Sequence, residues 1–210
     1  MAESGEPAVD AQAQAPGDPA APRPLVNAAN GLTVLRFGLV PLFVALMVTS
    51  QMTSPGYRIA AALAFLVASV TDFADGWIAR SFDQVTSFGK VADPIADKAL
   101  TGTALVLLSI YDRLPWWVTV VIAVREVGVT ALRFWVIRTT VLPASRGGKV
   151  KTVLQILAIS WYIWPFPDPI ALVGPWLMAI ALLVTVATGV DYVIRVLRVR
   201  RTATGQAAPL

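Results

Sequence analysis

Six long apolar segments constrain the fold of this chain more than any other feature. They cover roughly residues 32–51, 58–82, 90–112, 115–138, 149–166 and 169–197. A spanning α-helix needs about 20 mostly apolar residues, and each segment comes close to that length. Only 14% of the 210 residues are charged, whereas a soluble domain has about a quarter. The pattern predicts an all-α integral membrane protein with six transmembrane helices.

Lysine and arginine are concentrated at alternate ends of these segments. They lie in or beside the two tails, the connection between the second and third segments, and the connection between the fourth and fifth. The other connections hold only Arg58 and Arg113. Because cytoplasmic loops carry an excess of Lys and Arg, both termini are expected in the cytoplasm of a multi-pass protein of the cell (inner) membrane. Tryptophans near the opposite ends fit an interfacial aromatic belt: Trp116, Trp117, Trp161, Trp164 and Trp176.

The two ends of the chain lack the apolar pattern of the middle. Residues 1–24 consist mostly of Ala, Pro, Gly and acidic residues, and they predict a disordered N-terminal tail. Residues 202–210 predict a flexible C-terminal tail. Residues 25–201 are therefore expected to form one six-helix domain.

Composition limits the chemistry that this chain can perform. It contains no cysteine and no histidine, which excludes disulfides, thiolate nucleophiles and imidazole bases or ligands. Acid–base and metal chemistry must then fall to Asp and Glu, with Lys and Arg left to bind anions. The net charge of +4 favours membrane lipids and an anionic substrate over nucleic acid as partners.

An acidic stretch, residues 71–98, interrupts the apolar pattern. Asp72 and Asp75 are spaced i, i+3, and Asp93 and Asp97 are spaced i, i+4, so each pair lies on one face of its helix. If the chain turns back between them, the pairs face each other. Four carboxylates at membrane depth repel strongly unless cations neutralise them. All-oxygen ligands predict Mg²⁺ or Mn²⁺, and two such metals would form a clamp for phosphoryl transfer.

Residues beside the aspartates fit a phosphate ligand. Gly76 and Ala79 remove bulk on the side of the first pair, and Arg80 adds a planar cation suited to phosphate. One alternative is structural: the carboxylates form ion pairs with nearby cations or are solvated at a helix end. Another is a divalent cation transporter, although the four aspartates cluster on one membrane side without an acidic path through the other segments.

The acidic stretch carries a recognisable signature. The pattern is Asp72-x2-Asp75-Gly76-x2-Ala79-Arg80-x8-Gly89-x3-Asp93-x3-Asp97, which is eight positions across 26 residues. It resembles, without a gap, the signature of the CDP-alcohol phosphotransferase family, and the likeness extends over roughly residues 26–197. The stretches NAANGLTVLRF, REVGVTALR and PASRGGKVKTVLQ resemble those of the family members whose acceptor is glycerol 3-phosphate.

The resemblance implies a specific reaction and fold. The fold is a six-helix membrane domain, a homodimer, with two divalent metals at a site open to the cytoplasm. The primary hydroxyl of glycerol 3-phosphate attacks the phosphatidyl phosphorus of CDP-diacylglycerol, and CMP leaves. Asp72, Asp75 and Asp93 match the metal ligands of the family. Asp97 matches the general base and also counts among the metal residues.

The resemblance also implies the substrate contacts. Gly76, Arg80 and Thr86 match positions that hold the CDP part of the donor. Asn30 and Thr33 are expected to cap the first segment and to touch the same nucleotide.

Glycerol 3-phosphate is a dianion, so its site needs cations. The expected residues surround the connection between the fourth and fifth segments: Arg125, Arg133, Ser145, Lys149 and Lys151.

Two structural interpretations compete with phosphate binding at these positions. The lysines can belong to the general excess of positive charge in cytoplasmic loops. Glu126 can form an ion pair with one of the arginines. Asp191 is expected to pair with Arg195, its i, i+4 neighbour. Another acceptor, such as inositol phosphate, would use the same aspartate chemistry, and only an acceptor assay distinguishes it.

Overall fold

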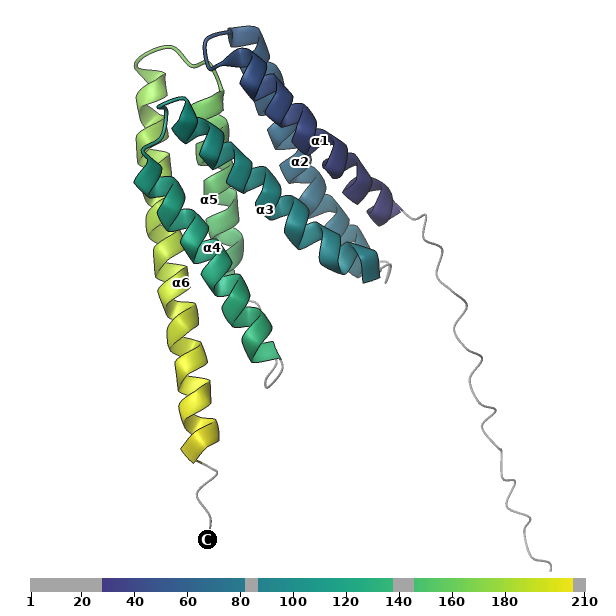
Figure 1. Ribbon diagram of the computed structural model, residues 1–210, viewed down its shortest axis with the longest axis vertical. Coiled ribbons are helices and arrows are strands. Elements are labelled where there is room, and N and C mark those ends of the chain that lie inside the picture. The colour runs from purple at the N-terminus through teal and green to yellow at the C-terminus, as the bar shows by residue number, and fades with distance from the viewer. Residues whose placement is uncertain (1–27, 82–86, 138–145, 206–210) are drawn as a thin grey trace, which may run out of the picture.

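The structure is a computed structural model, and it describes residues 28–81, 87–137 and 146–205, with side chains at residue 31 and at 34–72, 98–132 and 148–198. All regular elements in these ranges are helices. In chain order they are α1 (Ala28–Ser50), α2 (Pro55–Ser81), α3 (Ser87–Ile110), α4 (Trp116–Ile137), α5 (Arg146–Ile163), the 3₁₀ helix η1 (Ile170–Leu172) and α6 (Val173–Gly205) (Figure 1).

Each expected apolar segment overlaps one of these α-helices, so the prediction of an all-α chain is confirmed for the described residues. The sixth segment begins with η1 and continues as α6. The expected N-terminal tail lies outside the described residues. Of the expected C-terminal tail, only the part within α6 is described.

The helices form two groups that lie side by side (Figure 1). α1 packs chiefly against α2, and α5 against α6, while α3 contacts α1, α4 and α5. The α1–α2, α3–α4 and α5–α6 connections all lie at one end of the bundle, at the top of Figure 1. Successive helices are therefore antiparallel. The end of α2 and the start of α3, which carry the acidic stretch, lie toward the other end.

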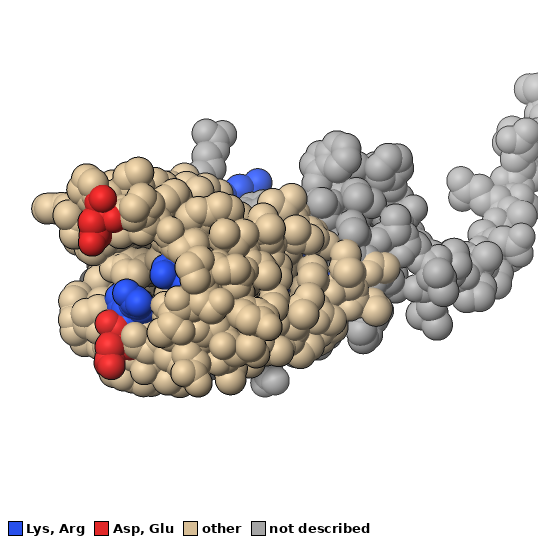
Figure 2. Space-filling model, turned by 90° about the horizontal axis from the view of Figure 1, so that it is seen from above, with Lys and Arg blue, Asp and Glu red and all other residues tan. Residues whose placement is uncertain are grey.

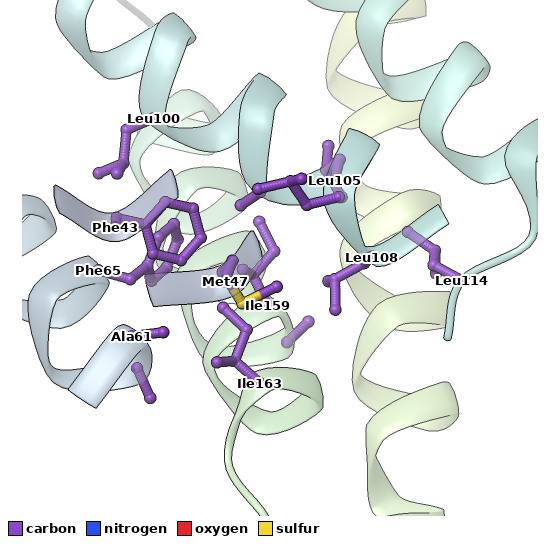
Figure 3. Packing of buried hydrophobic residues seen from close by; sticks show 14 of the residues in the cluster. Phe43, Met47, Ala61, Phe65, Leu100, Leu105, Leu108, Leu114, Ile159 and Ile163 are labelled. Carbon is purple, nitrogen blue, oxygen red and sulfur yellow. The ribbon is translucent and has the colours of Figure 1, made fainter. Parts of the chain in front are cut away.

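A buried apolar cluster has members on all six α-helices, and Figure 3 shows part of it. Its members recur three or four residues apart, because only that spacing keeps side chains on one helix face. The labelled members are Phe43, Met47, Ala61, Phe65, Leu100, Leu105, Leu108, Leu114, Ile159 and Ile163. The rings of Phe43 and Phe65 lie 5.5 Å apart, which ties α1 to α2. α2 also buries alanines at 61, 62, 64 and 68, and such small residues let neighbouring helices approach closely.

The outside of the bundle is apolar as well. Exposed large side chains include Val70 at 64%, Val124 at 66% and Leu183 at 70%. Among the described residues, Ile170–Arg198 is long and apolar enough to cross a membrane, and Val34–Ser50 and Lys98–Ile110 are shorter apolar helices. Water disfavours so large an apolar surface, whereas lipid chains accommodate it.

Candidate active site

Asp72, the first aspartate of the signature, forms an ion pair with Arg36. Arg36 Nη1 on α1 lies 2.6 Å from Asp72 Oδ1 on α2. The arginine side chain is fully buried and the aspartate is 28% exposed. A buried guanidinium needs such a partner, because an unpaired charge at this depth is costly. Arg36 therefore holds one Asp72 oxygen in a fixed position and leaves the carboxylate partly accessible.

Sequence reasoning did not single out Arg36. The available signal was a lone arginine inside the first apolar segment, where a charge requires a partner. The family stretch NAANGLTVLRF contains it, but the stretch does not say which carboxylate it meets.

The other three aspartates lie on the expected helices. Asp75 lies on α2, and Asp93 and Asp97 lie on α3, and these two helices contact each other. Asp75 is six residues before the end of α2 (81 − 75), and Asp93 is six residues after the start of α3 (93 − 87). Each position is therefore about 9 Å along its helix from the α2–α3 connection. The side chains of Asp75, Asp93 and Asp97 lie outside the described residues.

The signature aspartates are candidate ligands for a metal ion. Within the side chains that are described, no group of three or more Asp or Glu could hold a metal ion. Of the four aspartates, only Asp72 belongs to that set. The chemistry of the donors fits a hard divalent cation, since the signature offers carboxylate oxygens on two helices that are in contact.

The expected donor-binding residues are placed only by their backbones. Asn30 and Thr33 were expected to cap the first segment, but α1 begins at Ala28, so both lie within the helix and the capping prediction is wrong. Gly76 and Arg80 lie on α2. The side chains of these four residues are not among those described. Thr86 lies outside the described residues altogether.

A second charged cluster forms around Glu126 on α4. Its carboxylate accepts hydrogen bonds from Arg125 Nη1 at 3.1 Å, from Lys98 Nζ on α3 at 3.3 Å, and from Lys151 Nζ on α5. The alternative that Glu126 forms an ion pair with an arginine is confirmed for Arg125, and two lysines share the same carboxylate. The cluster carries three positive charges against one negative charge, a net of +2 (3 − 1).

Arg125 is held on its other side by α6. Its Nε donates to the Thr185 carbonyl at 3.0 Å, and its Nη2 donates to Thr188 Oγ1 at 2.9 Å. Gly189 leaves space for the Arg125 side chain to reach α6, because a Cβ at position 189 would lie 3.0 Å from Arg125 Cγ. The Glu126 cluster therefore joins α3, α4, α5 and α6 through one glutamate and one arginine.

A cavity of about 220 Å³ adjoins this cluster between α3, α4 and α5. Lys98, Glu126 and Lys151 line one part of it, and Leu105 and Ile122 line another. The cavity therefore offers a charged region next to an apolar one.

Of the other residues expected to bind glycerol 3-phosphate, only the two lysines have side chains that the structure describes. Lys151 is buried within the Glu126 cluster, whereas Lys149 is exposed on α5. The two lysines are two positions apart, so a helix turns them to different sides. Arg133 lies on α4 with a side chain that is not described, and Ser145 lies outside the described residues.

Together, the helical bundle, its apolar exterior and the aspartate-bearing helices define an integral membrane protein with a polar site between its helices. The family model of the CDP-alcohol phosphatidyltransferases matches residues 26–187. The chain belongs to this family, and the resemblance noted in the sequence is confirmed.

Curated relatives agree with this assignment. A probable phosphatidylglycerophosphate synthase of Mycobacterium tuberculosis (strain H37Rv) is 46% identical over 183 residues, covering 85% of this chain and 88% of the relative. A CDP-diacylglycerol–glycerol-3-phosphate 3-phosphatidyltransferase of Bacillus subtilis (strain 168) is 36% identical, covering 80% and 94%. A protein of the same name from Escherichia coli (strain K12) is 41% identical, covering 63% and 74%.

Proposed function

We propose that this chain transfers the phosphatidyl group of CDP-diacylglycerol to glycerol 3-phosphate. The products are phosphatidylglycerophosphate and CMP. Relatives that bear the name of this activity support the proposal, because they are 36% to 46% identical over most of the chain. The charge of the Glu126 cluster agrees with it, since a net of +2 (3 − 1) matches a phosphate dianion.

The aspartates of α2 and α3 would hold two Mg²⁺ or Mn²⁺ ions. Asp72, Asp75, Asp93 and Asp97 supply the oxygen ligands that such ions prefer. When bound, the metals supply positive charge that stabilises the diphosphate and the leaving CMP. Arg36 orients Asp72 through their ion pair, as a charged partner behind a metal ligand can do.

Asp97 is the proposed general base. The acceptor hydroxyl oxygen forms a bond to the phosphatidyl phosphorus, and the bond from that phosphorus to the CMP oxygen breaks. The hydroxyl proton passes to the Asp97 carboxylate. The chain contains no histidine, so a carboxylate is the available base of suitable basicity. Asn30, Thr33, Gly76, Arg80 and Thr86 are proposed to hold the CDP group.

The acceptor phosphate is proposed to bind at the Glu126 cluster and the residues that follow α4. Two hydrogen bonds to α6 fix the orientation of the Arg125 guanidinium group. Its positive charge is therefore held in one position for the acceptor phosphate. Lys151 is buried beside it. Lys149, Arg133 and Ser145 complete the proposed site.

The proposed topology has six membrane spans with both termini in the cytoplasm of a multi-pass protein of the cell (inner) membrane. The acidic stretch then opens to the cytoplasm, from which the water-soluble substrate, glycerol 3-phosphate, would enter. The proposed assembly is a homodimer.

The test is CMP release by purified protein in detergent with CDP-diacylglycerol and Mg²⁺. Glycerol 3-phosphate is compared with inositol phosphate, and wild type with Asp97→Asn. Asp191→Asn is the matched control, because Asp191 is an exposed aspartate whose partner is Arg195. Release that requires glycerol 3-phosphate, collapses in Asp97→Asn and persists in Asp191→Asn would support the proposal. Release with inositol phosphate alone would overturn the acceptor and keep the aspartate chemistry.

A further inference from the structure

A second pocket lies at the end of the bundle where the α1–α2, α3–α4 and α5–α6 connections meet. It encloses about 400 Å³. Acidic and basic side chains border a hollow on this end (Figure 2). Arg58 of the pocket and Asp72 are 14 residues apart on α2 (72 − 58), a rise of about 21 Å. The pocket is therefore separate from the proposed active site.

Arg58 is held rigidly at this pocket by the end of α5. Its Nε donates to the Ile163 carbonyl at 2.9 Å, and its Nη2 donates to the Tyr162 and Trp164 carbonyls at 3.2 and 3.0 Å. The last carbonyls of a helix lack partners within the helix, so the arginine satisfies them. Its Nη1 has no hydrogen-bond partner within the described part of the chain, which leaves donors for a ligand.

Arg113 lines the same pocket from the α3–α4 connection. Its Nη2 donates to the Met52 carbonyl at 3.2 Å, and no other bond of this side chain is found among the described residues. Neither Arg58 nor Arg113 forms an ion pair with a described carboxylate, although Asp112 and Asp168 border the pocket. Two anchored guanidinium groups with spare N–H donors are suited to a phosphate group.

The other walls of the pocket attract a cation. Asp112 and Asp168 bring two carboxylates that have no ion-pair partner in the described ranges. Trp161 and Phe166 stack with ring centroids 4.4 Å apart, and both line the pocket. An ammonium group is attracted both by carboxylates and by aromatic faces. With two positive and two negative side chains, the pocket favours a ligand that carries both charges.

The position of the pocket indicates where that ligand comes from. Trp116, Trp117 and Trp176 are exposed by 51%, 60% and 74%, and they lie at the helix ends that border the same end of the bundle. Tryptophan is enriched at the depth of lipid headgroups. The pocket therefore lies at the depth of the lipid headgroups, which favours a headgroup over a dissolved molecule as its ligand.

We propose that this pocket binds the zwitterionic headgroup of a phospholipid of the phosphoethanolamine type. The lipid belongs to the leaflet opposite the acidic stretch. Arg58 and Arg113 donate to the phosphate, and Asp112, Asp168 and the aromatic walls receive the ammonium group. This site is independent of the proposed transfer reaction, since no substrate of that reaction carries an amine on its headgroup phosphate.

The test is native mass spectrometry of the delipidated full chain. Phosphatidylethanolamine, phosphatidylglycerol, free phosphoethanolamine and inorganic phosphate are added separately. Arg113→Gln is the main variant, because Arg58 also caps α5 and its loss could unfold the protein. Arg195→Gln is the matched control, since Arg195 is exposed and lies near the far end of α6.

We expect phosphatidylethanolamine to bind about tenfold more tightly than phosphatidylglycerol, the effect of one charge-assisted contact. Arg113→Gln should weaken that binding by a similar factor, and Asp168→Asn should reduce the preference for the amine lipid. Arg195→Gln should change neither. Equal binding of the two lipids, or binding unaffected by Arg113→Gln, would overturn the proposal. Binding of free phosphate as tightly as lipid would also overturn it, by showing a general anion site.

Discussion

Replacing Glu126 with glutamine removes the single carboxylate that neutralises cations from three helices. Lys98, Arg125 and Lys151 all bond to it, and its side chain is 22% exposed. Removing one partner of a buried ion pair costs about 3–5 kcal/mol, because the remaining charge stays desolvated. Lys98 is 35% exposed, and water screens its part of the cluster. We therefore expect a loss of about 2–3 kcal/mol in the free energy of unfolding.

The measurement is thermal unfolding in detergent, followed by circular dichroism of the helices. A chain of this length loses about 2–4 °C in Tm per kcal/mol, so Glu126→Gln should lower Tm by about 4–12 °C. The matched control is Asp191→Asn. Its partner Arg195 lies 2.9 Å away, and the two side chains are 51% and 59% exposed. An exposed i, i+4 pair contributes about 0.3–0.5 kcal/mol, so this Tm should fall by less than about 2 °C.

A Glu126→Gln protein that unfolds within about 2 °C of the Asp191→Asn control would refute this reasoning. It would mean that the three cations are hydrated despite their geometry, and that the Glu126 cluster does not hold the helices together. The same protein can be assayed for CMP release, which separates a stability role from a role in acceptor binding.

Two further substitutions test the geometry of the two charged regions. Gly189→Ala would place a Cβ 3.0 Å from Arg125 Cγ and 3.1 Å from its Nε, so it should raise the KM for glycerol 3-phosphate severalfold. Gly128→Ala, which meets nothing within 4 Å, should leave the KM unchanged, and equal effects of the two would contradict the argument. Arg36→Gln removes the partner of Asp72 and should raise the Mg²⁺ concentration for half-maximal CMP release about 10–100-fold. An unchanged Mg²⁺ titration in folded protein would show that Arg36 has only a structural role.

Much of the local structure follows directly from the sequence. Apolar runs of spanning length predict the helices, because a backbone without water must bond within its own segment. The spacing of the signature aspartates places two on α2 and two on α3. The pair of Asp191 and Arg195 is confirmed at 2.9 Å, since i, i+4 neighbours meet on any helix.

The long-range partners follow only from the packing of the helices. Arg36 meets Asp72 because α1 lies against α2, and nothing in the spacing of the two residues indicates this. The sequence offered an arginine as one possible partner of Glu126, but its bonds to Lys98 and Lys151 come from α3 and α5.

Arg58 illustrates the same limit at the other end of the bundle. In the sequence it is one of the few cations of the presumed outer connections, and in the fold it caps the carbonyl end of α5, over a hundred residues away. Helical periodicity is a local property of the chain, and it determines which residues share a face. Which faces meet depends on how six helices fit together in space, so only the tertiary structure decided the partners of the charges.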